Sequence, residues 1–284
     1  MKKIFKTILK TLGFQSLIRF YHFVKISVSN IKNIRILKQY VINHGGNLKN
    51  EDNFILFSIK SKNTRDVNYA LRKRSSDVMV FQQLIIEEEY QGVIDLLNKH
   101  KIKVNSIIDA GANIGLSTVF FKNLYPSSTV VCIEPDDDNC LVINKHVNMN
   151  EFSNVFIEKV GLWDLNSYLT IVKDFRDGAK WSLRVKAVDY ETKLRGVSVN
   201  YLLNKYNLKE IDLLKIDIEG SEKILLENED NLKEYISLVK VACIEVHEEF
   251  IATSKVISIL EKHNFVCFRI LDLTIGIRKD LIQN

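Results

Sequence analysis

SIIDAGANIG, residues 106–115, is the stretch that decides the fold. Its first four residues form a short apolar run that closes on Asp109, which is typical of a buried parallel strand. The small residues that follow allow a sharp turn into a helix, because Gly111 and Gly115 lack a Cβ and let a ligand lie against the backbone. Residues 116–124 continue as an apolar helix. The stretch therefore predicts the strand, turn and helix with which α/β folds bind a nucleotide-like ligand.

The spacing of the glycines separates two kinds of nucleotide site. A GxGxxG dinucleotide fingerprint beginning at Gly111 would need glycine at positions 113 and 116, where this chain has Asn113 and Leu116. The pattern is instead DxGxNxG, and it resembles motif I of class I S-adenosylmethionine-dependent methyltransferases in the form used by the FkbM family. The resemblance implies that Asp109, Gly111, Asn113 and Gly115 bind S-adenosylmethionine. A turn that serves only packing is the alternative.

Composition predicts one large α/β domain with a small extension. The chain has 284 residues, 46% of them apolar and only 2 of them proline, which is typical of a globular protein. Residues 1–50 contain ten Lys or Arg and no Asp or Glu, whereas residues 51–284 contain 30 basic and 35 acidic residues. A strongly basic arm thus precedes a mildly acidic body.

The cysteines and the hydropathy pattern predict a cytoplasmic protein. The 4 cysteines show neither a CxxC pair nor a metal-ligand spacing, so we expect reduced, buried thiols. No apolar run approaches the ~20 residues that span a bilayer. The N-terminus also lacks the apolar core and small-residue cleavage site of a signal peptide.

The basic arm predicts an amphipathic helix. In MKKIFKTILKTLGF, residues 1–14, apolar residues recur at helical spacing and lysines fall on the other face. Such an arm, through residues 1–26, could contact an anionic membrane at its inner face; packing on its own domain is the alternative. No nucleic-acid partner is expected, since aromatic interleaving and base-reading motifs are missing.

Three segments are predicted along the chain. The turn cluster HGGNLKNEDN, residues 44–53, ends the arm, so we expect a basic helical arm at 1–50, a lead-in strand and helices at 51–100, and a class I methyltransferase domain at 101–284. In the lead-in, Ser76 or Asp77 is predicted to cap a helix. This segment resembles the FkbM lead-in through the residues Ser76, Asp77, Phe81, Gln83, Glu89 and Tyr90.

Glu134 and Gly161 extend the predicted donor site. Glu134 ends the apolar run 129–133, about twenty residues after the glycine turn, where an acid can accept hydrogen bonds from both ribose hydroxyls. This feature is common to NAD and S-adenosylmethionine sites. The next acids, residues 136–138, are typical of a helix N-terminus. The family resemblance implies that the backbone at Gly161 lines the adenine, while Trp163 fits either that pocket or the core.

The segments at 169–173 and 182–188 predict a β-ribbon. The polar loop between them, residues 174–180, contains Phe175, Arg176 and Asp177. Because loops on a rigid scaffold commonly carry specificity, we expect acceptor binding there.

KIDIEGSE, residues 215–222, is the second specific motif. It resembles the FkbM signature KxDxEGxE through the residues Lys215, Asp217, Glu219, Gly220 and Glu222. It would place carboxylates at the carboxyl end of a strand that adjoins the first one, beside the sulfonium of the donor, and buried acids there are costly unless used or paired. A simple helix cap by Asp217 is the alternative.

A further strand, residues 239–246, brings His247 to the same edge of the predicted sheet. We therefore expect Asp217, Glu219 and His247, in that order, to act as the base or to orient the acceptor. No residue spacing in the sequence indicates a metal site.

Together the motifs predict a doubly wound, seven-stranded, mostly parallel sheet with an N-terminal helical extension. The resemblance implies a methyltransferase that uses S-adenosylmethionine, with O-methylation of a sugar hydroxyl on a glycan, glycolipid or secondary metabolite. A nicotinamide-dependent oxidoreductase and a non-catalytic membrane-binding or glycan-binding module are the alternatives.

Overall fold

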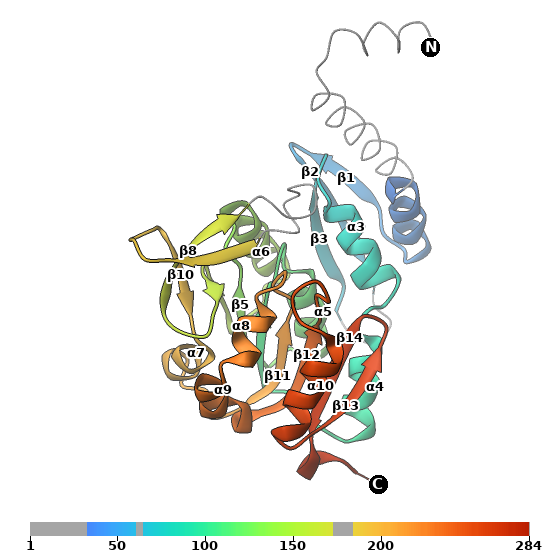
Figure 1. The fold of residues 1–284 in the computed structure, drawn as a ribbon. Helices are drawn as coiled ribbons and strands as arrows, with labels where there is room; N and C mark the ends of the chain where they lie inside the picture. Colours follow the sequence, from blue (N-terminus) through green and yellow to red (C-terminus); the bar gives the residue numbers. More distant parts are fainter. Residues whose placement is uncertain (1–32, 61–64, 173–183, 284) are drawn as a thin grey trace, which may run out of the picture.

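The computed structural model describes residues 33–60, 65–172 and 184–283 (Figure 1). The predicted amphipathic helix within residues 1–26 and the predicted acceptor loop at 174–180 lie outside these residues. Among the described helices, none is both long and apolar enough to cross a bilayer.

The centre of the molecule is a seven-stranded sheet, as predicted. Only β14 runs antiparallel to both of its neighbours, and the other strands share one direction. In spatial order the strands are β13 (Phe265–Ile270), β14 (Leu273–Arg278), β12 (Val239–Glu245), β11 (Ile211–Ile216), β4 (Ser106–Ala110), β5 (Thr129–Ile133) and β6 (Val155–Glu158).

Both faces of this sheet are covered, because its strands are apolar on both sides. In β4 the neighbouring residues Ile107 and Ile108 are fully buried but belong to two different core clusters, one on each face. The helices that pack on the Ile107 face are α4 (Gln91–Lys99), α5 (Leu116–Leu124) and α6 (Asp137–Met149). Those on the Ile108 face are α7 (Val199–Lys205), α8 (Glu222–Glu227), α9 (Glu229–Tyr235) and α10 (Thr253–Lys262).

The lead-in segment forms a three-stranded antiparallel sheet at the top of Figure 1. It consists of β1 (Leu48–Glu51), β2 (Phe54–Ile59) and β3 (Val67–Arg72), and it packs with the helix at 33–43, with α3 (Asp77–Phe81) and with the π-helical turn η1 (Gln82–Ile86). Its apolar side chains belong to the same core cluster as the Ile107 face. The division of the chain at residues 50 and 100 stays a prediction.

One buried histidine connects this small sheet to the glycine turn. His146 in α6 donates from Nδ1 to the carbonyl of Ile114 (2.8 Å) and accepts at Nε2 from the N–H of Ala70 in β3 (3.0 Å). Burial lowers the pKa of His146 to about 4, so the ring is neutral and can act as donor and acceptor at once. The lead-in sheet thereby fixes the start of α5.

The predicted cap of α3 is only partly confirmed. Ser76 stands at the N-cap but makes no capping hydrogen bond with its side chain. The carboxylate of Asp77 instead accepts two hydrogen bonds of 2.9 Å each from the guanidinium of Arg72. At residues 136–138 the expectation holds, because Asp136 caps α6 by accepting from the N–H of Asn139 (2.9 Å).

A separate four-stranded sheet lies at the left of Figure 1, in the order β7, β10, β8, β9. Its strands are β7 (Gly161–Leu162), β8 (Ser167–Val172), β9 (Arg184–Val188) and β10 (Leu194–Val197). The predicted ribbon is β8 and β9, whereas β10 was not predicted. Trp163 packs with Leu169 in the core of this sheet and is almost fully buried, so it belongs to the core and not to a pocket. The 3₁₀ turns η3 (Ile236–Leu238) and η4 (Lys279–Leu281) complete the described fold.

Candidate active site

A pocket opens where the carboxyl ends of β4, β5 and β11 meet the four-stranded sheet. The empty space inside it, including open solvent at its mouth, is about 560 Å³. Its lining consists of Gly111, Asn113, Ile133, Glu134, Pro135, Asn139, Val160, Gly161, Leu162, Val185, Asp217, Ile218 and Glu219. Six of the predicted site residues are therefore brought together in one hollow, whereas Asp109, Gly115 and His247 are not part of its lining.

The glycine turn is held against the end of β11. Gly111 has φ +74°, and a Cβ built there would stand 1.6 Å from the carbonyl oxygen of Asp217. The turn is clamped from the other side as well, since the N–H groups of Gly111 and Ala112 both donate to the carbonyl of Ile133 (3.0 Å each). Only glycine allows this close approach of the two backbones.

Asp109 and Gly115 support the turn from outside the pocket. Asp109 is fully buried, and its Oδ2 accepts from the hydroxyls of Ser117 (2.6 Å) and Thr118 (2.7 Å) in the first turn of α5. Gly115, with φ +79°, precedes α5 and packs on Ile143. The family resemblance implied that both bind the donor; in the structure they shape the segment that carries Gly111 and Asn113.

Lys215 connects the two motifs. Its side chain is buried, and Nζ donates to the carbonyl of Gly111 (2.8 Å). Nζ also lies 3.4 Å from Oδ1 of Asp109 and 3.5 Å from Oδ2 of Asp217. Burial alone would lower the pKa of Lys215, but the two carboxylates outweigh it and the pKa is raised, so the ammonium keeps its charge. No role was predicted for Lys215 from the sequence. A lysine inside a buried apolar strand nevertheless indicates a buried group of opposite charge, because lysine is rarely buried without one.

Glu134 points its carboxylate at the pocket. Oε2 accepts from the N–H of Asn113 (2.8 Å), and Oε1 accepts from the N–H of Asp136 (2.9 Å) and from the amide of Asn139 (3.2 Å). Burial outweighs these hydrogen bonds and raises the pKa of Glu134 to about 7. The group is thus a buried acid near its titration point that further hydrogen-bond donors would stabilise in the charged form.

Asp217 does not cap the following helix, so the alternative that it serves only as a helix cap is wrong. The N-cap of α8 is Ser221, and the N–H of Ile218 donates to Oε1 of Glu222 (3.0 Å). Asp217 is 29% exposed at the pocket wall, and among the residues that the structure describes its ion-pair partner is Lys215. Glu219, also in the wall, has φ +53°. A non-glycine residue in this left-handed region costs on the order of 1–3 kcal/mol, a strain that concentrates at functional sites.

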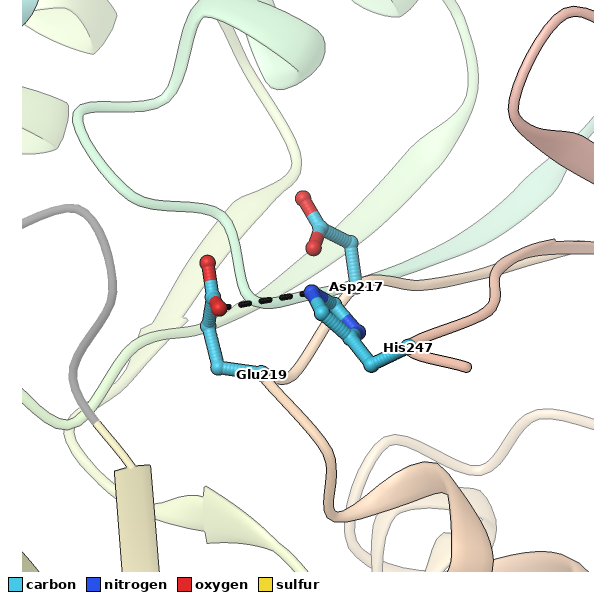
Figure 2. Close-up of side chains that lie close together, drawn as sticks. All are labelled: Asp217, Glu219 and His247. Carbon is cyan, nitrogen blue, oxygen red and sulfur yellow. Dashed lines mark ion pairs between the residues drawn. The ribbon is translucent and has the colours of Figure 1, made fainter. Parts of the chain in front are cut away.

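His247 stands between two glutamates just behind the pocket wall. Nδ1 donates to Oε1 of Glu222 (3.0 Å), and Nε2 lies 3.3 Å from Oε2 of Glu219 (Figure 2). Burial would lower the pKa of His247, but the two carboxylates raise it to about 11, so the ring holds its proton at neutral pH. In this state His247 orients Glu219 and cannot accept a further proton.

Two further acids, Glu245 and Glu89, lie near Asp217 at the carboxyl edge of the sheet. Glu245 ends β12, and the carboxylate of Asp217 together with burial raises the pKa of Glu245. Glu89 is buried, receives a hydrogen bond from Gln83 (2.9 Å) and has its pKa raised by burial. Asp217 also contributes to that rise. Glu89 belongs to the lead-in segment that resembles the FkbM family, but its position near Asp217 follows only from the fold.

Comparison with known proteins agrees with the geometry. The model of the methyltransferase FkbM domain matches residues 109–267, more than half of the chain. Methyltransferase 1 of Beauveria bassiana (strain ARSEF 2860) is 26% identical over 147 residues, which cover 44% of this chain and 58% of that protein. The matched part of the chain thus spans little more than half the length of that relative.

Two further similarities cover a larger part of the chain. Methyltransferase sdnD of Sordaria araneosa is 26% identical over 192 residues, 56% of this chain and 73% of that protein. Among solved structures, a putative caffeoyl-CoA O-methyltransferase from Staphylococcus aureus is 13% identical, covers 72% of this chain and 93% of that chain, and has a TM-score of 0.44.

We predict that Lys215→Met destabilises the protein by about 3–5 kcal/mol, because it leaves Asp109 and Asp217 beside each other without their cation. Urea unfolding followed by circular dichroism measures this change. Adding Asp109→Asn should recover at least about 1 kcal/mol of the loss, since it removes one of the unpaired charges. An unfolding midpoint equal to that of the parent would contradict the role given to Lys215.

Proposed function

The chain belongs to the family of methyltransferases with an FkbM domain, and from this premise we propose that it transfers a methyl group from S-adenosylmethionine to a hydroxyl of a small polyhydroxylated acceptor, such as a sugar. The strand order, with β14 antiparallel, is that of the class I methyltransferase fold. One observation carries the proposal: Lys215 holds the glycine turn and Asp217 together, so a donor site and a carboxylate-rich edge share one pocket.

The residues that line the pocket suit the donor in polarity and charge. Its apolar walls suit the adenine: Ile133, Pro135, Val160 and Leu162. Glu134 is suited to the ribose, because its buried carboxylate gains from hydroxyl donors. The turn at Gly111 and Asn113 adjoins Asp217, whose negative charge suits a sulfonium. When bound, S-adenosylmethionine supplies an electrophilic methyl group whose bond to sulfur breaks as the acceptor oxygen forms its own.

Positioning is the main task that this chemistry gives to the protein. Holding two reactants in line can lower a barrier by about 7–11 kcal/mol, whereas a general base contributes about 10²–10⁴ in rate. We assign the hydroxyl proton to the pair formed by Asp217 and Glu245, because the carboxylate of Asp217 and burial raise the pKa of Glu245, and a raised carboxyl pKa suits a base near neutral pH. His247 and Glu219 orient the acceptor.

The acid-rich edge supports a hydroxylated acceptor. Carboxylates accept hydrogen bonds and do not donate them when ionised, and hydroxyl groups supply the matching donors. Asp217 lies close enough to Glu245 and Glu89 to raise the pKa of both, so the three acids form one acceptor-facing set. An anionic acceptor would be repelled by this edge.

We predict that donor affinity falls about tenfold between pH 8 and pH 6, because ribose hydroxyls donate to the charged form of Glu134 and its pKa is about 7. Calorimetric titration with S-adenosylhomocysteine measures this. Glu134→Gln should bind more weakly at pH 8 and show no such pH dependence. His247→Ala is the control and should bind the donor like the parent; if Glu134→Gln also does so, the ribose lies elsewhere.

We predict release of S-adenosylhomocysteine when the protein is incubated with S-adenosylmethionine and uncharged hydroxylated acceptors, beginning with a panel of methyl glycosides. Mass spectrometry detects both products. Asp217→Asn should lower kcat by about 10²–10⁴, the usual contribution of a base, with little change in donor affinity. Glu227→Gln, on the exposed side of α8, is the matched control. Donor binding without turnover on any acceptor, or transfer only to amines, would count against the proposal.

We also propose that the basic arm brings the enzyme to the inner face of a membrane, where a glycolipid acceptor would be found. The lysines Lys2, Lys3, Lys6 and Lys10 support this, since each is worth about 1 kcal/mol near an anionic surface. Replacing all four with Gln should weaken sedimentation with phosphatidylserine vesicles by up to about a thousandfold. Equal binding of parent and variant, or equal binding to neutral vesicles, would refute this contact.

A further inference from the structure

Three side chains at the carboxyl edge of β11 and β12 face a common space. Asp217 and Glu219 follow β11, and His247 follows β12. One oxygen of each carboxylate and one ring nitrogen all lie within 4.8 Å of one another. Figure 2 shows the two carboxylate groups and the imidazole ring turned towards one another. Oxygen and imidazole nitrogen are the atoms with which proteins bind divalent cations.

The spacing of these atoms is close to that of ligands on one ion. Ligands at about 2.0–2.2 Å from a metal stand roughly 3.0–3.5 Å apart at octahedral or tetrahedral angles and about 4.2 Å apart on opposite sides. Oε2 of Glu219 and Nε2 of His247 are 3.3 Å apart. The largest separation, 4.8 Å, needs a contraction of about half an ångström, which the partly exposed Asp217 can supply by a small rotation.

His247 is already oriented as a metal-binding histidine would be. Its Nδ1 donates to Glu222, which leaves Nε2 as the nitrogen that faces Glu219. Histidine ligands usually donate their other N–H to a carboxylate in this way, which fixes the ring and makes it a better ligand. Glu222 is fully buried, so its position does not depend on solvent.

Carboxylate oxygens with incomplete hydrogen bonding surround the same space. Oε2 of Glu219 is buried and has Nε2 of His247 as its ion-pair partner at 3.3 Å, whereas Oε2 of Glu222 is buried and makes no hydrogen bond with any described residue. Glu245, beside them, makes no hydrogen bond or ion pair with any residue that the structure describes. Buried oxygens without partners are costly, and a cation would satisfy them. A proton on His247 satisfies only part of this charge.

We propose that Asp217, Glu219 and His247 bind one divalent cation, with Glu222 as the positioning residue for His247. Two carboxylates and one imidazole suit ions that accept both oxygen and nitrogen, and Mn²⁺ is the best match among them. The ion replaces the Nε2 proton of His247, which passes to solvent.

The role of the ion follows from its place beside the acceptor edge. A cation there would bind an acceptor hydroxyl directly and favour the loss of its proton. This role rests on the proposed function, whereas binding of the ion does not and can be measured with neither donor nor acceptor present.

Titration of the full, chelator-treated chain with Mn²⁺ alone tests the site, with electron paramagnetic resonance to count the free ion. We expect one site per chain, and nitrogen coupling from an imidazole in the bound spectrum. Asp217→Asn and His247→Gln should each abolish saturable binding, and His247→Gln should remove any nitrogen coupling that remains. Glu222→Gln should weaken binding roughly 10–100-fold, the usual effect of losing such a partner.

Glu248→Gln is the matched control, because it removes an exposed acid next to His247 that bonds to Thr253 and not to the cluster. It should bind Mn²⁺ like the parent. Thermal unfolding of each variant, followed by circular dichroism, shows which of them remain folded. The proposal is overturned if the parent shows no saturable binding, if its bound Mn²⁺ lacks nitrogen coupling, or if folded Asp217→Asn binds as tightly as the parent. The titration contains neither donor nor acceptor, so a failure of the proposed function would not change its result.

Discussion

The buried ammonium of Lys215 is the interaction on which the rest of the site depends. It lies between the ends of β4 and β11, donates to the glycine turn and neutralises Asp109 and Asp217. An unpaired charge at such a depth would be prohibitive, so lysine and aspartates have to fold together. The glycine turn and the Asp217 edge of the pocket are therefore held together by one side chain.

A second constraint is the accumulation of acids around Asp217. Five carboxylates converge on one edge: Glu89, Asp217, Glu219, Glu222 and Glu245. Within the part of the chain that the structure describes, Lys215 and His247 form ion pairs with this set. Such an arrangement lowers stability, because each charge raises the cost of the next. Carboxyl groups whose pKa values are perturbed by burial and by neighbouring charges concentrate at functional sites.

The local sequence was sufficient to predict a strand wherever both faces of that strand are buried in the same apolar environment. The strands β4, β5, β11 and β12 are apolar runs that are buried on both faces, and such runs can be recognised without knowing their neighbours. The strands β7 and β10 could not be recognised in this way. Gly161–Leu162 is too short to show a period, and Leu194–Val197 pairs with strands on both sides that are distant in sequence. Likewise Ser76 has the chemistry of a cap, but Arg72 draws Asp77 into a different bond.

The sequence by itself determined the sheet, the glycine turn and the family, because motif spacing and apolar runs are local properties of the chain. Only the tertiary structure decided which motif residues face the pocket. Gly111 and Asn113 line it, while Asp109 supports them from within the core. It also decided that His247 holds a proton between Glu219 and Glu222 and that Glu245 and Glu89 join Asp217. These assignments depend on distances between strands that are remote in sequence, and electrostatic interactions respond to distance and burial and not to residue order.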